Sequence, residues 1–362
     1  YGANWSNFTK SLIMQKLEVF GVNKLKGQIK ISGSKNASLP ILAATLLTNK
    51  KIILKNLPKV RDIETMMLLL QSLGSKIKLN KNKIIINNSK QNKKFASYSL
   101  VKTMRAGILV LGPLLAKYKS AKVSLPGGCA IGTRPVDIHL KALSKLGVKY
   151  KIDQGYVIAN APKGLIGNKI RFPKVSVGAT ENAILAAFNS QGETILSNCA
   201  IEPEIHDLVL FLNNLGGKIK ISNRKIFIMG IQKIKKNIVH KIIFDRIELG
   251  TYMIAAALVG KKITFNNINS KIIQTEIKIL KKMGVKIKTT KNKIIILKSN
   301  NLKKTNVITK PYPGFPTDLQ AQLMVLMIRA KGISKIKESI FENRFMHVPE
   351  LKRMGAKIEI KD

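Results

Sequence analysis

A loop that contains a cysteine and an arginine is the part of the sequence in which residue types and spacing most clearly indicate chemistry. Residues 125–135 read Leu-Pro-Gly-Gly-Cys-Ala-Ile-Gly-Thr-Arg-Pro, and this density of glycine and proline predicts a structured loop. Arg134 follows Cys129 closely, and a nearby cation lowers the pKa of an exposed thiol. Cys129 is therefore a candidate nucleophile or proton donor; the alternative is an inert, small apolar side chain. Cys199 has no such neighbours, and we expect it to be structural.

The elements that must position this loop recur along the chain with a period of roughly 70 residues. In each unit an amphipathic helix ends at a glycine, which predicts a left-handed C-cap, and a strand of alternating lysine and apolar residues follows. The glycines are Gly74, Gly147, Gly216, Gly284 and Gly355. In the first four units a polar turn and a return strand predict a hairpin. The fifth predicted strand, residues 357–360, is followed only by Lys361 and Asp362.

A second, more apolar helix recurs in every unit, and we expect it to be buried on most of its faces. These helices are predicted to start at Lys35, Arg105, Gly178, Gly250 and Asp318. Polar residues gather at or just before the starts, as at Ser176 and in the segment 245–248. Free N–H groups at a helix start bind anions, so several such ends facing one cleft would suit a phosphate-rich ligand. For any single end, ordinary N-capping is the alternative.

Five segments, in order and at consistent spacing, resemble the signature segments of the UDP-N-acetylglucosamine 1-carboxyvinyltransferase family. They are residues 31–37, 125–135, 174–180, 315–322 and 341–346. The resemblance runs from Met14 to the end of the chain and implies an α/β fold, a two-domain inside-out α/β barrel of repeated βαβαββ units. Five of the family's six repeats are present, so we expect a chain truncated at its C-terminal end.

The domain boundaries follow from the same resemblance. Residues 1–13 are expected to be an upstream extension, and residues 35–243 to form the first domain with three repeats. Residues 14–34 and 244–362 are expected to form the second domain, in which the last repeat is missing.

The resemblance also implies the roles of individual residues. Lys35, Asn36 and Arg134 are similar to groups that bind phosphoenolpyruvate, and Lys35 is expected to be catalytic as well. Cys129 is similar to the proton donor that fosfomycin alkylates. Asp318 is similar to the catalytic carboxylate at the sugar 3-hydroxyl, with helix capping as its alternative or additional role. The positions that match UDP-sugar-binding residues are Arg105, Arg134, Pro135, Val136, Asp137, Ile138, Lys174, Val175, Ser176, Val177, Asp318 and Ile340.

Four further polar residues lie in segments similar to those of the family. Arg344 resembles a cleft arginine that contacts substrate, and a surface ion pair is its alternative. Glu202, Asp245 and Glu248 are expected to be hinge or cleft structure in preference to chemistry. His139, His206 and His347 are interpreted as structural, and His240 has no assigned role.

The activity that the resemblance implies is transfer of an enolpyruvyl group from phosphoenolpyruvate to the 3-hydroxyl of UDP-N-acetylglucosamine. Phosphate is released, and peptidoglycan precursor synthesis begins. We expect no cofactor and no metal, and a cytoplasmic monomer that is not inserted in a membrane. One alternative is a truncated, inactive remnant that still binds UDP-sugar. Another is the sister enzyme acting on shikimate 3-phosphate, but that enzyme does not use a Pro-Gly-Gly-Cys loop.

The formal charge of +45 raises the possibility of nucleic-acid binding. The cations are mainly lysines that alternate with isoleucine and asparagine, as in residues 76–81, and arginine and aromatic residues are not clustered along the sequence. We therefore interpret the charge as belonging to solvated strand faces and expect no nucleic-acid partner.

Overall fold

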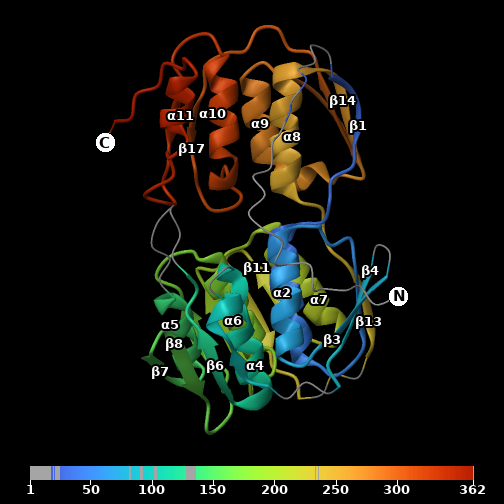
Figure 1. Cartoon of the computed structure of the whole chain (residues 1–362), viewed down its shortest axis with the longest axis vertical. Coiled ribbons are helices and arrows are strands. Elements are labelled where there is room, and N and C mark those ends of the chain that lie inside the picture. Colours follow the sequence, from blue (N-terminus) through green and yellow to red (C-terminus); the bar gives the residue numbers. More distant parts are fainter. Residues whose placement is uncertain are drawn as a thin grey trace.

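The chain forms two lobes stacked along its long axis (Figure 1). This computed structural model describes residues 18, 20, 25–80, 83–89, 93–101, 104–127, 136–232, 234 and 236–361. Cys129, Arg134, Pro135 and the expected upstream extension, residues 1–13, lie outside the described residues, as does the side chain of Arg105.

The first lobe contains three copies of one four-stranded sheet. In each copy an edge strand runs parallel to a second strand. The second strand pairs antiparallel with the nearer strand of a hairpin, whose other strand forms the opposite edge of the sheet. The first sheet has the order β13 (Ile238–Lys241), β2 (Ile52–Lys55), β4 (Lys83–Asn87), β3 (Lys76–Asn80). The second has the order β5 (Phe95–Ala96), β6 (Ser120–Ser124), β8 (Tyr156–Asn160), β7 (Lys149–Asp153). The third has the order β9 (Lys169–Arg171), β10 (Glu193–Ser197), β12 (Lys225–Met229), β11 (Lys218–Ser222).

Helices alternate with these strands, so that each sheet is accompanied by an inner and an outer helix. The inner helices are α1 (Lys35–Ala44) with η2 (Thr45–Leu47), η3 (Arg105–Val110) with α4 (Leu111–Tyr118), and α6 (Val177–Ala187). The outer ones are α2 (Arg61–Ser72), α5 (Asp137–Lys145) and α7 (Pro203–Asn214), and the short α3 (Tyr98–Val101) precedes η3. Every residue of α1 from Ala37 onward and every residue of α6 from Ala179 onward is buried, which confirms that these helices are interior.

The second lobe repeats the pattern once in full and once in part. Its complete sheet has the order β1 (Leu25–Ile29), β14 (Gly260–Asn266), β16 (Lys293–Leu297), β15 (Lys286–Thr290). Its remaining sheet is the parallel pair β17 (Asn306–Ile308) and β18 (Lys335–Lys337). The helices are α8 (Arg246–Val259), η4 (Ser270–Ile273), α9 (Gln274–Lys282), η5 (Thr317–Leu319), α10 (Gln320–Ile328) and α11 (Val348–Arg353).

The predicted glycine caps and hairpins are confirmed. Each of the five glycines follows an outer helix and has a positive φ: Gly74 101°, Gly147 92°, Gly216 106°, Gly284 87° and Gly355 92°. Glycine adopts this conformation without a steric cost from Cβ. The four hairpins are β3–β4, β7–β8, β11–β12 and β15–β16.

Two details of the predicted elements are wrong. Residues 357–360 form no strand, because no described strand pairs with them. Helix α8 begins at Arg246, four positions before the predicted start at Gly250, because Asp245 caps it. This inner helix is also less enclosed than expected, since Tyr252 and Val259 are exposed.

Buried apolar side chains form two separate cores. One contains side chains between Ala37 and Ile242, and the other contains Ile31 and side chains between Leu249 and Met327. We propose that these cores belong to the two domains predicted from the sequence, with boundaries near residues 34 and 243. In the described part of the chain, no helix is both long enough and apolar enough to cross a lipid bilayer.

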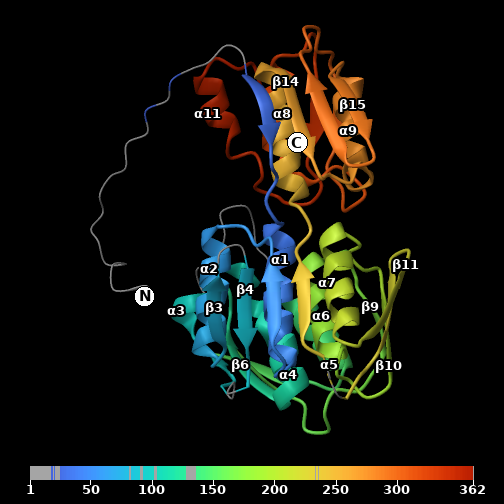
Figure 2. The same cartoon turned by 90° about the vertical axis from the view of Figure 1, so that its right-hand side faces the viewer.

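The lobes exchange one strand each. β13 comes after the other strands of the first lobe, yet it pairs with β2 near the start of that lobe. β1 precedes the first lobe, yet it pairs with β14 in the second. The chain therefore crosses between the lobes twice, and the two connections, residues 30–34 and 242–245, run side by side (Figure 2).

Candidate functional site

The two connections are joined by a short antiparallel contact that places the starts of α1 and α8 together. Gly33 bridges Phe244, and the Ser34 N–H donates to the carbonyl of Ile243 at 2.7 Å. Asp245 caps α8 by accepting from the N–H groups of Ile247 at 2.8 Å and Glu248 at 3.0 Å. These contacts support the hinge interpretation of Asp245.

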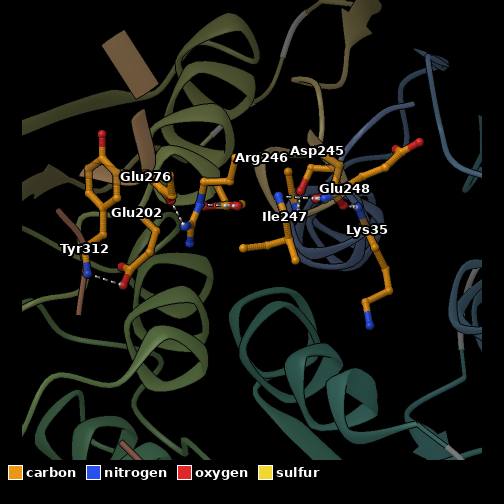
Figure 3. A network of polar contacts seen from close by, with 11 residues as sticks. Lys35, Glu202, Asp245, Arg246, Ile247, Glu248, Glu276 and Tyr312 are labelled. Atoms are coloured by element: carbon orange, nitrogen blue, oxygen red, sulfur yellow. Dashed lines mark hydrogen bonds and ion pairs between the residues drawn. The ribbon is translucent and has the colours of Figure 1, made fainter. Parts of the chain in front are cut away.

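Asp245 also reaches the first lobe, and Glu248 reaches back to the first connection. The second Asp245 oxygen, Oδ2, accepts from the backbone N–H of Lys35 at 3.1 Å, which fixes the start of α1 to the start of α8 (Figure 3). Glu248 accepts from the N–H of Ser32 at 3.0 Å and from its hydroxyl. Glu248 is therefore structural at this joint.

Lys35 itself extends away from the carboxylates of this joint (Figure 3). Its Nζ lies 3.3 Å from Oδ2 of Asp62 on α2, and both side chains are partly exposed. Ser34 caps α1 by accepting from the N–H of Ala37 at 3.3 Å, and Asp245 accepts from the N–H of Lys35, so the first turn offers a side-chain cation and the positive end of the helix dipole. Asn36 is the next residue and is partly exposed. This end of α1 can hold a phosphate group. The Asp62 partner was not anticipated from the sequence.

Asp318 and Arg344 are two predicted site residues that the structure brings into contact. The Arg344 Nη2 donates to Oδ1 of Asp318 at 2.7 Å, and the Asp318 side chain remains 44% exposed. Asp318 does not act as a helix cap, since η5 is preceded by Pro316 and has no side-chain cap. The carboxylate is therefore oriented by a guanidinium and remains open to a ligand, as a positioned base requires.

Glu338 organises the loop around this pair, and sequence reasoning missed it. Its carboxylate accepts from the hydroxyls of Thr309 at 2.8 Å and Thr317 at 2.9 Å, and from the N–H of Ile340 at 2.8 Å. Thr317 immediately precedes Asp318, so one carboxylate holds two predicted site segments together. The only sequence signal was its position between the segments 315–322 and 341–346.

The remaining predicted substrate-binding residues lie at the starts of α5 and α6. Ser176 caps α6 by accepting from the N–H of Ala179 at 3.4 Å. Lys174 and Val177 next to it are exposed, and Val175 is half-buried. At α5, Val136 is half-buried and Asp137 is exposed. Ile138 is 6% exposed and belongs to the first core, so its side chain is not available to a ligand.

The surroundings of two further residues, His139 and Cys199, make them poor candidates for proton transfer or nucleophilic attack at neutral pH. Burial lowers the pKa of His139 to about 4, and its Nδ1 lies 3.2 Å from the amide nitrogen of the buried Asn182. Burial also raises the pKa of Cys199 to about 12. A thiol with this pKa stays protonated at neutral pH and is a poor nucleophile, which supports the structural interpretation of Cys199.

A cluster of buried charges, which sequence reasoning missed, lies beside the two connections between the lobes. Arg246 of α8 donates through Nε to both oxygens of Glu204, at 3.1 and 3.4 Å, and its Nη1 lies 3.9 Å from Glu276 (Figure 3). Glu202 accepts from the N–H of Tyr312 at 3.4 Å. Glu202 and Glu204 belong to the first lobe, whereas Glu276 and Tyr312 belong to the second, so this cluster also connects the lobes.

The chain thus combines repeated units and two strand-exchanged lobes with a cation in the first lobe, at Lys35, and an oriented carboxylate in the second lobe, at Asp318. Residues 19–362 match the family model of EPSP synthase (3-phosphoshikimate 1-carboxyvinyltransferase). The chain belongs to this family and is an enolpyruvyl transferase.

The curated relatives show to which group within this family the chain is most similar in sequence. The UDP-N-acetylglucosamine 1-carboxyvinyltransferase of Pelagibacter ubique is 68% identical over 348 residues, which are 96% of this chain and 83% of the relative. The protein of the same name from Helicobacter pylori is 48% identical over 351 residues, again 96% of this chain and 83% of the relative. Within the family, the chain groups with the UDP-N-acetylglucosamine 1-carboxyvinyltransferases, the group that its sequence segments resemble.

Solved structures confirm the predicted fold. The enolpyruvyl transferase NikO from Streptomyces tendae has a TM-score of 0.82 at 20% identity and covers 94% of this chain and 81% of its own. EPSP synthase from Acinetobacter baumannii has a TM-score of 0.67 at 17% identity, over 87% of this chain and 74% of its own. At sequence identities of 17% and 20%, these comparisons show a shared fold and carry no conclusion about function.

Proposed function

We propose that the chain transfers the enolpyruvyl group of phosphoenolpyruvate to the 3-hydroxyl of UDP-N-acetylglucosamine and releases phosphate, in peptidoglycan precursor synthesis. The observation that carries the proposal is the Asp318–Arg344 pair, an exposed carboxylate held by a guanidinium at 2.7 Å. The high identity to relatives named for this reaction supports the choice of substrates.

Binding of phosphoenolpyruvate is assigned to the start of α1 and to the cysteine loop. Lys35 supplies a point charge beside the positive end of the α1 dipole, and the two together suit a phosphate. The ion pair with Asp62 is exposed on both sides, so a dianionic phosphate can replace Asp62 at a small energetic cost. Asn36 and Arg134 complete this group by the family resemblance, and Arg134 lies outside the described residues.

The chemical steps are an addition followed by an elimination. Asp318 accepts the proton of the sugar 3-hydroxyl as its oxygen bonds to C2 of phosphoenolpyruvate, and Cys129 gives a proton to C3. The bond from C2 to the phosphate oxygen then breaks, and loss of a proton from C3 restores the double bond. The role of Cys129 rests on the resemblance, because this residue lies outside the described ones.

Binding of the UDP-sugar is assigned to the starts of α5 and α6 and to the loop at Ile340. Backbone and side-chain donors are available at Lys174 and Ser176, and the exposed side chain of Val177 can pack against a ring. Because the Ile138 side chain is buried, its contribution is limited to backbone groups.

The assay that tests this function is phosphate release from phosphoenolpyruvate, measured with and without UDP-N-acetylglucosamine. Release that depends on the UDP-sugar and yields the enolpyruvyl product by mass spectrometry is the expected result. Calorimetry in parallel distinguishes the alternative: binding of UDP-N-acetylglucosamine without turnover would identify a binding remnant. Release with shikimate 3-phosphate in place of the UDP-sugar would contradict the proposed acceptor.

Replacing Lys35 by glutamine is expected to lower kcat/KM for phosphoenolpyruvate by about 10- to 100-fold, because a charge-assisted contact with phosphate contributes about 1.5–3 kcal/mol. The KM for UDP-N-acetylglucosamine should change much less. Lys50→Gln, at an exposed lysine beyond the same helix, is the matched control and should behave like the unmodified chain. An equal effect of both variants would show that general positive charge, and not Lys35, attracts the substrate.

A further inference from the structure

Two sheets of the first lobe share one junction, at the point where the second strand ends beside the edge strand. In each, an asparagine follows the second strand and donates to the carbonyl of the residue that follows the edge strand. The Nδ2 of Asn56 donates to Ile242 at 3.0 Å, and that of Asn198 donates to Phe172 at 2.9 Å. The N–H groups of Ile242 and Phe172 donate back to the last residue of the second strand, both at 3.0 Å. In these units the asparagine closes the junction.

The last unit keeps this junction but has a carboxylate where the others have an amide. Thr309 follows the edge strand β17 and donates through its N–H to the last residue of β18 at 3.0 Å, so it corresponds to Ile242 and Phe172. Glu338 directly follows β18, in the position of the asparagines. Here the Thr309 carbonyl accepts from the hydroxyl of Ser339 instead. A neighbouring residue thus replaces the amide donor, and the Glu338 carboxylate binds other groups.

The Glu338 carboxylate accepts hydrogen bonds from both segments that carry the proposed base and its guanidinium partner. Oε2 accepts from the hydroxyl of Thr317 at 2.9 Å, and Thr317 immediately precedes Asp318. Oε1 accepts from the N–H groups of Ile340 at 2.8 Å and Phe341 at 3.2 Å. Hydrogen bonds to a charged acceptor are among the stronger ones in proteins. One side chain therefore joins the segment before α10 to the loop after β18.

These hydrogen bonds reach both members of the Asp318–Arg344 pair. Thr317 fixes the backbone next to Asp318. Phe341 carries an aromatic ring beside the Arg344 guanidinium, whose Cζ lies 5.7 Å from the ring centroid. Arg344 in turn donates to Oδ1 of Asp318 at 2.7 Å. The direction of the Asp318 carboxylate is consequently set from two sides.

We propose that Glu338 is a positioning residue for the reaction: through Thr317 and Phe341 it fixes Asp318 and Arg344 relative to each other and directs the Asp318 carboxylate at the sugar hydroxyl. This inference rests on the proposed function, in which Asp318 takes up the hydroxyl proton. A displacement of about 1 Å near the reacting groups can slow a reaction by about 10²-fold. Such a loss lowers kcat and leaves KM nearly unchanged, because it affects the transition state and not substrate binding.

Thr317→Val tests the contact toward Asp318 alone, because valine has nearly the shape of threonine but no hydroxyl. We expect kcat for phosphate release to fall about 10-fold, with KM for both substrates within about threefold of the unmodified chain. Thr305→Val is the matched control. Thr305 is a buried threonine of the same lobe whose hydroxyl has no hydrogen-bond partner among the described residues, so kcat should not change. Equal kcat values for the two variants would overturn the proposal.

Two substitutions of Glu338 separate its geometry from its charge. Glu338→Ala removes all of its side-chain hydrogen bonds and should lower kcat about 100-fold. Glutamine can keep them: its oxygen accepts from Ile340 and Phe341, and its amide donates to the Thr317 hydroxyl, which is also an acceptor. Glu338→Gln should therefore retain kcat within about fivefold. A loss in Glu338→Gln as large as in Glu338→Ala would contradict the positioning role, since the charge would then be what the reaction requires.

The Asp318→Asn background distinguishes positioning from a general loss of structure. A residue that acts through Asp318 has little effect once that carboxylate is absent, so adding Thr317→Val should lower the residual kcat by less than about twofold. A merely structural role would lower kcat by the same factor in both backgrounds. The same factor in both would therefore reject the proposal.

Hydrogen exchange of the full chain without substrates measures the contacts of Glu338 independently of catalysis. Mass spectrometry should show exchange at the Ile340 and Phe341 amides about 10-fold faster in Glu338→Ala, because each loses its acceptor, and unchanged in Thr305→Val. Unchanged exchange in Glu338→Ala would overturn the proposal. Faster exchange in a chain whose unmodified form releases no phosphate would reject the proposed function, while the anchoring by Glu338 would stand. Phosphate release that Thr317→Val does not slow would reject the positioning role alone.

Discussion

Asp318→Asn is expected to slow phosphate release by about 10²- to 10⁴-fold, the range that a positioned general base contributes. The amide has nearly the same shape and can still accept a hydrogen bond from Arg344, but it cannot take up the proton of the attacking hydroxyl. KM for both substrates should change little, because the loss is confined to the transition state. Steady-state kinetics at saturating substrate give the measurement.

A matched control uses a second exposed aspartate that is also paired with a cation. Asp153 contacts Lys151 at 3.0 Å at the end of β7, in the first lobe, and Asp153→Asn should leave turnover unchanged. Exposed ion pairs contribute about 0–1 kcal/mol to stability, so the free energy of unfolding of both variants should stay close to that of the unmodified chain. Turnover of Asp318→Asn within threefold of the unmodified chain would exclude Asp318 as the base.

The largest effect on stability is expected from Gly33→Ala. A Cβ at Gly33 would lie 1.6 Å from the backbone oxygen of Asn56, so the backbone itself must move. Asn56 has a φ of 63° and its Nδ2 donates to the carbonyl of Ile242 at 3.0 Å, which leaves it little freedom to retreat. We expect a loss of about 3 kcal/mol or more in the free energy of unfolding, measured by urea titration.

Gly178→Ala provides the comparison. At Gly178 the nearest atom to an added Cβ belongs to the His139 ring, at 3.1 Å, and a side chain can shift where a backbone cannot. Alanine also favours the helical conformation of α6, so the net change should stay within about 1 kcal/mol. Equal destabilisation by the two substitutions would show that the close approach of Gly33 to the Asn56 backbone does not determine the cost of adding a side chain at this position.

The sequence predicted the repeated framework because local chemistry specifies it. Gly74 and its four counterparts stand where a helix needs a left-handed cap, and alternating residues such as Ile77 and Leu79 define a strand without reference to the rest of the chain. The strand predicted at 357–360 is absent for the opposite reason: strand formation needs a partner, and alternation alone does not supply one.

The site could be predicted only in part. Lys35 and Asp318 were found because they lie in recognisable segments, but the assignment of their roles and of the substrate-binding set stays a prediction. Glu204 and Glu276 could not be found. Each is an acidic residue in the first turn of a helix, a position normally explained by the helix dipole and solvent exposure. Their burial depends on a tertiary arrangement that brings α7 and α9 to one arginine.

The exchanged strands also dictate when the protein can fold during synthesis. Gln28 of β1 and Asn266 of β14 are hydrogen-bonded although they are 238 positions apart in the chain. A ribosome adding about 5–20 residues per second needs roughly 10–50 seconds to deliver that partner. During this interval β1 has no strand to pair with, and β2 of the first lobe likewise lacks β13. Neither lobe can therefore be completed on the nascent chain before β13, residues 238–241, and β14, residues 260–266, have been translated. Chaperone binding to the nascent chain should therefore concentrate on β1 and β2.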